Sequence, residues 1–200
     1  MHTIDIDDQR YIEANFRRLP ALCAAWGIPA RTVKEQIAAE VMPDATYRFG
    51  ESGEFFPDDY FVFPLCIAPE DRHGTFLRRL HAACTGLDLA FSGEDAEETW
   101  RDYLRGAYGV CLRVVLPETI VRKVRLIAAI EREIATPDPG DAAWRKRLTS
   151  AVDGLDALLK PFARLDRETH GGSVSRDRYV TNVRLRFGIE AAGASGANVR

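Results

Sequence analysis

Apolar residues recur every three or four positions along most of this chain, which is the spacing of amphipathic helices. Tyr11, Ile12 and Phe16 fall on one face of a predicted helix over 7–17. The same spacing, bounded by proline, glycine and capping residues, predicts four further long helices. They cover 69–86, 93–109, 117–135 and 141–169, the last with a kink at Pro161.

The stretch 19–43 predicts two short helices that meet at Gly27. Glycine has no Cβ and adopts a positive φ at low cost, which suits the turn between two crossed helices. Pro29 can open the second helix because its missing N–H would be unpaired there, and Pro43 ends that helix. The sequence therefore predicts a helix-turn-helix near the start of the chain.

This stretch resembles the helix-turn-helix of MerR-like regulators and excisionases. The matching positions are Gly27 and Ile28, the Arg-Thr-Val run at 31–33 and the Val-Met-Pro run at 41–43. The Tyr-Arg-Phe run at 47–49 follows where such proteins begin a wing. The resemblance implies a second helix that reads the major groove of DNA.

Binding to DNA needs cations, because neutralisation of phosphates supplies most of the non-specific affinity. The residues that would contact DNA are Arg31 and Lys34, supported by Arg17 and Arg18. Two glutamates within 19–43 balance the first pair. DNA binding is therefore possible but electrostatically weak, and the alternative is a helical unit that serves structure or partner docking.

The segment 44–64 changes character, with glycines, prolines and many aromatic residues. It predicts a short hairpin that pairs 47–49 with 54–56 and turns at 51–53. The aromatic side chains, Tyr47 and Tyr60 among them, either staple the two halves of the chain together or form a wall for a small planar ligand.

Two other segments leave the choice between helix and strand open. The run 110–116 has the composition of a strand, or continues the preceding helix as far as the proline at 117. The segment 170–187 suits either a capped helix or an alternating strand.

The start of that last segment is a candidate anion site. Two glycines and Ser173 precede Arg176 and Arg178, and such a loop before an arginine-rich element can bind a phosphate or carboxylate. His170 is the obvious acid–base group beside it. The alternative is a terminal element held by salt bridges.

A second cluster of cations lies at the front of the predicted helix 117–135. Arg122, Lys123 and Arg125 oppose the positive end of the helix dipole there. A bound anion or an acidic neighbour would compensate for this placement, so an anion near these three residues is a further hypothesis.

Composition restricts the remaining possibilities. Apolar residues make up 46% of the 200 residues and charged residues 28%, with a net charge of −3, as in an ordinary globular protein. The four cysteines form no CxxC motif, and the chain shows no signal peptide and no long apolar run, so we expect reduced thiols, a cytoplasmic location and no membrane segment. His73 and His81 are two helical turns apart, and we predict no metal and no cofactor.

The order of the runs YIEANF, TYRF, DDYFVFP and GGSVSRDR resembles an uncharacterised bacterial family of natural-product biosynthesis proteins. The resemblance implies a role beside a biosynthetic pathway. The fold that we expect is mainly α: a helix-turn-helix unit with a small wing over 1–65, a helical bundle over 66–190 and a flexible tail over 191–200.

Three functions remain open from the sequence. The first is a helical protein of secondary metabolism that binds or transforms a small anionic or aromatic metabolite in a cleft between the two halves. The second is a helix-turn-helix transcriptional regulator. The third is a non-catalytic protein that docks on a pathway enzyme. No motif identifies the protein as an enzyme.

Overall fold

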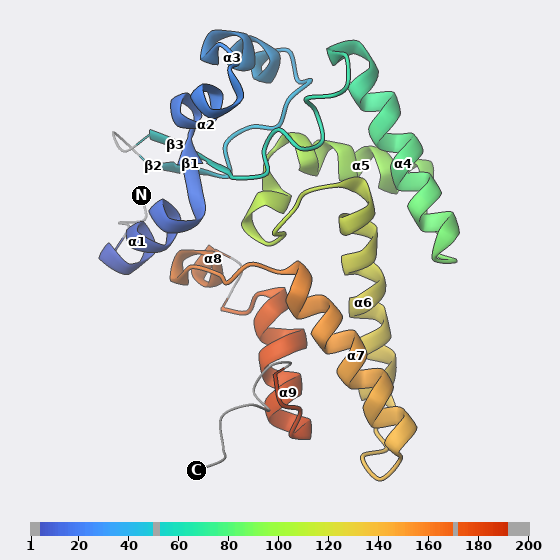
Figure 1. Ribbon diagram of the computed structural model, residues 1–200. Helices are drawn as coiled ribbons and strands as arrows, with labels where there is room; N and C mark the ends of the chain where they lie inside the picture. Colours follow the sequence, from blue (N-terminus) through green and yellow to red (C-terminus); the bar gives the residue numbers. More distant parts are fainter. Residues whose placement is uncertain (1–4, 50–52, 170–171, 192–200) are drawn as a thin grey trace.

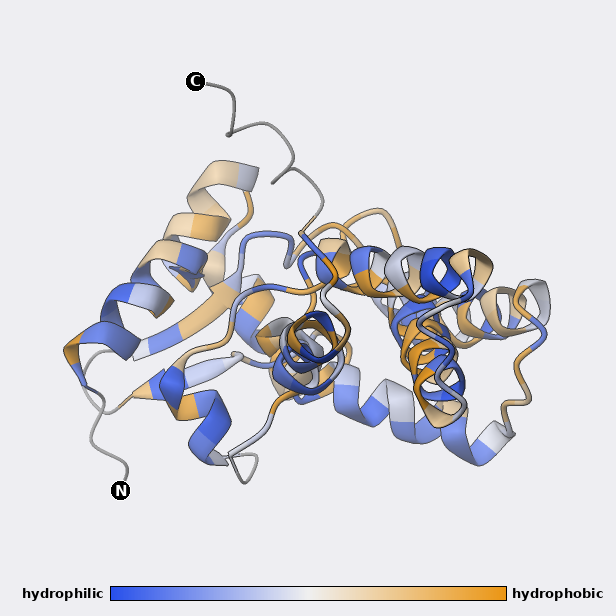
Figure 2. Ribbon diagram, turned by 90° about the horizontal axis from the view of Figure 1, so that it is seen from below, coloured by the Kyte–Doolittle hydropathy of each residue, from blue (hydrophilic) through white to orange (hydrophobic). Residues whose placement is uncertain are grey.

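The computed structural model describes residues 5–49, 53–169 and 172–191. The fold is mainly helical, as predicted, with N-terminal helices and a small sheet followed by a helical bundle (Figure 1). Most helices carry hydrophilic and hydrophobic residues side by side along the ribbon, as amphipathic helices do (Figure 2). No helix in the described ranges is long and apolar enough to cross a bilayer.

Three helices form the front of the chain. Helix α1 covers Ile6–Asn15, and the carboxylate of Asp5 caps it by accepting the backbone N–H groups of Asp7 and Asp8. Helix α2 covers Leu19–Trp26 and helix α3 covers Ala30–Ala38. Gly27 lies between them with a φ of 65°, the left-handed conformation expected for this turn.

The sheet has three antiparallel strands in the order β1-β3-β2. The predicted hairpin is formed by β2, Tyr47–Phe49, and β3, Gly53–Pro57. Of the turn predicted over 51–53, the first two residues lie outside the described residues, and Gly53 belongs to β3. The third strand, β1, covers Phe16–Arg18 and pairs with the other edge of β3. The prediction of helix through residue 17 was wrong, because pairing with β3 holds these three residues extended.

The bundle consists of α4 to α9 and three short helical segments. Their bounds are η2 Pro69–Asp71, α4 Arg72–Gly86, α5 Gly93–Leu104, η3 Ala107–Val110, α6 Pro117–Ala135, α7 Ala142–Leu158, α8 Arg164–Thr169, the π-helical segment η4 Asp177–Thr181 and α9 Asn182–Phe187. Helices α6 and α7 lie side by side as its longest pair, with α4 packed on α6 (Figure 1). Phe76, Leu80 and Leu155 are fully buried in its core.

The buried guanidinium of Arg72 joins the front of the chain to α4. Its Nε donates to the carbonyl oxygens of Pro64 and Ile67 at 3.1 and 3.2 Å. Its Nη1 donates to the side chain of Gln36 at 2.8 Å and to the carbonyl oxygen of Val41 at 3.2 Å. One side chain thus connects α3 and the segment after it with the start of the bundle.

Two predictions around the bundle helices were wrong at their ends. The helix expected over 93–109 ends at Leu104, because Gly106 adopts a φ of 71°. The run 110–116 is neither strand nor helix: beyond η3 it forms a single bridge, between Leu112 and Leu159.

The C-terminal helices also differ from the prediction. The helix expected over 141–169 does not kink at Pro161 but ends at Leu158. Proline has no N–H for the helical hydrogen bond and its ring collides with the preceding turn, so the chain stays extended until α8 begins at Arg164. Of the two alternatives for 170–187, the helix is confirmed over 175–187.

We predict that Gly106→Ala lowers the free energy of unfolding by about 2 kcal/mol or more. A Cβ at Gly106 would lie 2.6 Å from the carbonyl oxygen of Asp44, in addition to the strain of its positive φ. Gly27→Ala is the matched control, because Gly27 also has a positive φ but no atom within 4 Å of the added Cβ. Urea denaturation should give about 1 kcal/mol for that control, and equal losses for the two variants would contradict the role of close approach at Gly106.

Candidate functional site

The front of the chain, residues 5–63, meets the bundle through buried hydrogen bonds, and we call this contact the junction. Tyr47 donates its hydroxyl to both carboxylate oxygens of Asp166, at 2.9 and 3.0 Å. Asp8 accepts the backbone N–H groups of Arg164 and Leu165 at 2.7 and 3.2 Å, at the start of α8. These contacts join α1 and β2 to a helix more than 100 residues away in the sequence.

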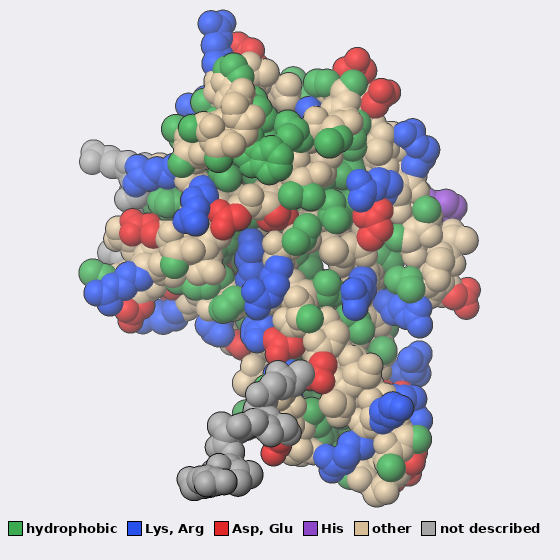
Figure 3. Space-filling view, viewed as in Figure 1, with side chains coloured by type: hydrophobic (Ala, Val, Ile, Leu, Met, Phe, Trp, Pro, Cys, Tyr) green, Lys and Arg blue, Asp and Glu red, His purple; other side chains and the backbone are tan. Residues whose placement is uncertain are grey.

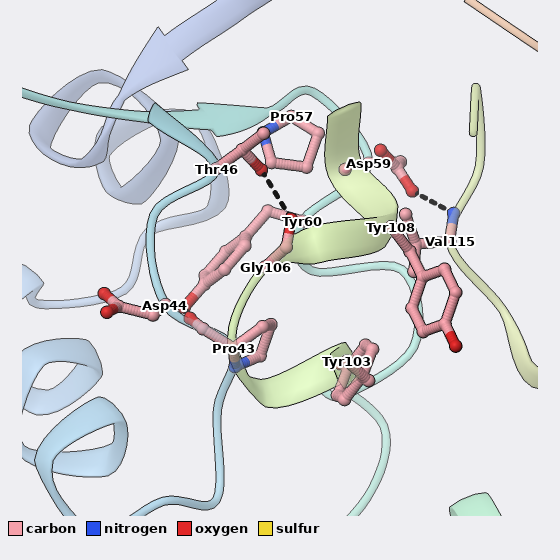
Figure 4. A pocket seen from close by; sticks show the side chains of 11 residues that line it. Pro43, Asp44, Thr46, Pro57, Asp59, Tyr60, Tyr103, Gly106, Tyr108 and Val115 are labelled. Carbon is pink, nitrogen blue, oxygen red and sulfur yellow. Dashed lines mark hydrogen bonds between the residues drawn. The ribbon is translucent and has the colours of Figure 1, made fainter. Parts of the chain in front are cut away.

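A small cavity lies within the junction, between 43–60 and 103–115 (Figure 4). Its volume is about 20 Å³, which is enough for one water molecule. The hydroxyl of Tyr60 donates to the carbonyl oxygen of Pro43 at 2.6 Å, and that of Thr46 donates to the carbonyl oxygen of Gly106 at 3.2 Å. The polar groups around this cavity therefore mostly bind one another.

Two buried polar atoms at the junction cavity have no hydrogen-bond partner among the described residues: Oδ1 of Asp59 and the hydroxyl of Tyr103. One water molecule could accept from Tyr103 and donate to Asp59. The other carboxylate oxygen of Asp59 accepts the backbone N–H of Val115, as Figure 4 shows. This arrangement suits an internal water rather than an organic ligand.

Burial perturbs the titratable groups of the junction. It raises the pKa of the Asp59 carboxyl, and it lowers the pKa of the Lys160 ammonium, because in both cases the charged form loses solvation. The ammonium of Lys160 donates to the carbonyl oxygen of Gly109 at 3.3 Å and lies 4.6 Å from the centre of the Phe16 ring. Both groups bridge the front of the chain and the bundle.

A larger cavity, which we call the bundle pocket, lies between α4, α5 and α6 and has a volume of about 270 Å³. The residues that line it are Cys84 of α4, Leu89, Ala90 and Phe91 of the α4–α5 connection, Thr99 of α5, Tyr108 of η3, and Ile120, Val121, Lys123, Val124 and Ile127 of α6. Tyr108 also lines the junction cavity, and its ring extends away from Thr46 and Pro57 (Figure 4). Tyr108 thus lines both cavities.

The walls of the bundle pocket are apolar apart from a few groups. Burial raises the pKa of Tyr108 to about 12 and also raises the pKa of the Cys84 thiol, so both are neutral at physiological pH. The hydroxyl of Thr99 donates to the carbonyl oxygen of Asp95 at 2.7 Å. Among the described lining residues Lys123 alone is charged. Its ammonium lies 3.2 Å from the sulfur of Cys111.

The residues predicted as an anion site are spread over the start of the last helix. Arg176 forms an ion pair with Asp156 and donates to the carbonyl oxygen of Leu159 at 3.4 Å. Arg178 is exposed and stacks over the ring of Tyr179 at 5.3 Å from its centre. Ser173 is exposed, and His170 lies outside the described residues.

The residues predicted as an aromatic wall are not neighbours of the bundle pocket. Tyr47 and Tyr60 are both buried in the junction, where Asp166 and the carbonyl oxygen of Pro43 accept their hydroxyls. Of the two, Tyr60 lines the small junction cavity.

The cations considered for DNA binding lie on two elements. Arg31 of α3 is 2.8 Å from Glu35, and Arg17 of β1 is 3.2 Å from Asp58. Arg18 stacks over the Phe55 ring, and Lys34 is exposed. Basic and acidic side chains are interspersed over the face of the molecule seen in Figure 3, so this face carries no extended positive field.

Lys123 was predicted as part of a cation cluster but not as part of a pocket. The available signal was its position between Ile120 and Ile127, which lie one helical turn to either side on the same face of α6. The α4–α5 connection, which lines the pocket, carried no sequence signal of that role.

Among the described residues no three His, Cys, Asp or Glu side chains are placed to hold a metal ion.

We predict that Asp59→Asn stabilises the protein at neutral pH relative to the wild type. Because the folded-state pKa of Asp59 is raised, ionised Asp59 weakens the fold, and this penalty disappears as the pH falls below the ordinary carboxyl value of 3.8. The side-chain carbonyl of asparagine can still accept the backbone N–H of Val115, but it carries no negative charge. Urea denaturation of both proteins from pH 3.5 to pH 7 should show the difference growing with pH, whereas a constant or reversed difference would contradict it.

Residues 73–188, more than half of the chain, match a family of unknown function, DUF6058. The matched range begins within α4 and ends just beyond α9, so it contains every residue that lines the bundle pocket but not the front of the chain. No curated protein and no solved structure shows significant similarity to the chain. On the match over its helical bundle, the chain belongs to the family of unknown function DUF6058.

Proposed function

We propose that this protein binds a small, mainly apolar organic molecule in the bundle pocket. The observation that carries the proposal is a cavity of about 270 Å³ with aliphatic and aromatic walls and one charged lining residue. Sites for small molecules are concave and mainly apolar, with few polar groups, and this volume is just below their usual range of about 300 to 1,000 Å³. The ligand is therefore small.

The position of this site differs from the cleft between the two halves that the sequence suggested. The cavity at the junction holds about 20 Å³ among the described residues, too little for a metabolite. The family resemblance noted from the sequence would make the ligand an intermediate or product of a natural-product pathway. Binding rather than transformation is proposed, because the lining residues offer no nucleophile paired with a base.

The proposal does not extend to DNA. Arg31 and Arg17 face carboxylates within 3.2 Å, so a phosphate would compete with Glu35 and Asp58 for these cations. A surface that binds DNA also needs a net positive field. The net charge of this chain is −3, which does not favour such a field.

Obstructing the bundle pocket should weaken binding. Val124 lies on its rim with 47% of its surface exposed, so Val124→Trp can place an indole in the opening without burying new volume in the core. With the neutral dye Nile red as probe, we expect the affinity to fall about tenfold or more, because the dye loses the apolar walls.

The matched control is Leu185→Trp, on α9 at 78% exposure and away from the pocket. This variant should bind the dye as the wild type does. Equal binding by the wild type and Val124→Trp, with unchanged melting temperatures, would overturn the proposed site.

A further inference from the structure

We infer that the ligand of the bundle pocket is an amphiphile with a single carboxylate, and that the ammonium of Lys123 binds this group. The inference rests on the proposed function and names its ligand class. It begins from the surroundings of Lys123, which is half-buried on the wall of the pocket. Among the described residues no carboxylate lies within 4.0 Å of its ammonium, and the hydrogen-bond partner found there is the Cys111 sulfur at 3.2 Å.

A thiol is a weak acceptor and leaves most of the charge of an ammonium uncompensated. Removing a cation from water is costly unless an anion replaces the lost solvation. The acid nearest in sequence, Glu118, already accepts two hydrogen bonds from Arg79, at 2.7 and 2.8 Å. The ammonium of Lys123 is therefore not paired with an acid among the described residues, and it can form a charge-assisted hydrogen bond with the carboxylate of a ligand.

The position of Lys123 on α6 fixes how the rest of the ligand lies. Ile120 and Ile127 are three and four residues from Lys123, so their side chains share its face of the helix. When the carboxylate of a ligand binds Lys123, the apolar part of that ligand therefore lies against an aliphatic wall. The pocket offers one cation, which matches a monoanion better than a dianionic phosphate.

The remaining polar groups of the pocket do not oppose this assignment. The hydroxyl of Thr99 is committed to a backbone carbonyl, and Tyr108 and Cys84 are neutral at physiological pH. No negative charge on the described lining residues repels a carboxylate.

Two probes with the same apolar chain separate the acid group from the apolar body: octanoate and 1-octanol, titrated calorimetrically at pH 7.5. The wild type should bind octanoate about tenfold more tightly than octanol. Lys123→Met, of similar length, should bind the two equally, and Lys123→Arg should keep the preference because it keeps the charge. Lys146→Met, which removes an exposed lysine of α7, should behave as the wild type.

The outcomes distinguish the two proposals. If the wild type binds both probes equally, or if Lys123→Met keeps the preference for octanoate, the acid-binding role of Lys123 is wrong while the pocket stands. If neither probe binds, or if Val124→Trp binds both as the wild type does, the pocket itself is wrong and this inference falls with it.

Discussion

The hydrogen bonds of a single buried cation, Arg72, join the front of this protein to the start of its bundle. Its guanidinium contacts no carboxylate among the described residues and instead donates hydrogen bonds to Gln36 and three backbone carbonyls. A planar fork of five donors can satisfy several carbonyls in fixed directions, which a lysine cannot do. These acceptors come from α3, the segment after it and the connection to α4, so their positions depend on one another through Arg72.

At the junction, too, polar side chains of one part form hydrogen bonds with the other part. Asp8 caps α8, and Tyr47 binds Asp166, so polar groups from the front of the chain complete the backbone hydrogen bonds of the C-terminal part. Leaving a buried polar group without its hydrogen-bond partner costs more free energy than the hydrogen bond contributes when it is formed. The junction is therefore closely fitted, and the space that it leaves is that of one water molecule.

The bundle pocket lies where packing is less constrained. Helices α4 and α6 pack directly on each other, and residues of the connection between α4 and α5 line the cavity beside them. Tyr108 lines both this apolar space and the polar junction cavity.

The sequence by itself determined the elements that depend on local signals. Gly27 ended α2 because only a residue without a Cβ adopts its φ cheaply, and Ser92 and Asp141 capped α5 and α7 with their own side chains. It also placed Lys123 in a cluster of cations at the front of α6, where they oppose the helix dipole. It could not determine strand β1, since three residues have no periodicity and pair only when β3 is beside them.

Only the tertiary structure decided which polar residues meet and where space remains. Tyr47 and Tyr60 have the composition of a ligand wall, but Asp166 and a backbone carbonyl from other elements occupy their hydroxyls. The pocket exists because α4, α5 and α6 bring together residues from 84 to 127, and a volume left between packed helices leaves no trace in the order of residues. Local preferences fix the helices, whereas cavities and buried hydrogen bonds depend on distances that folding alone creates.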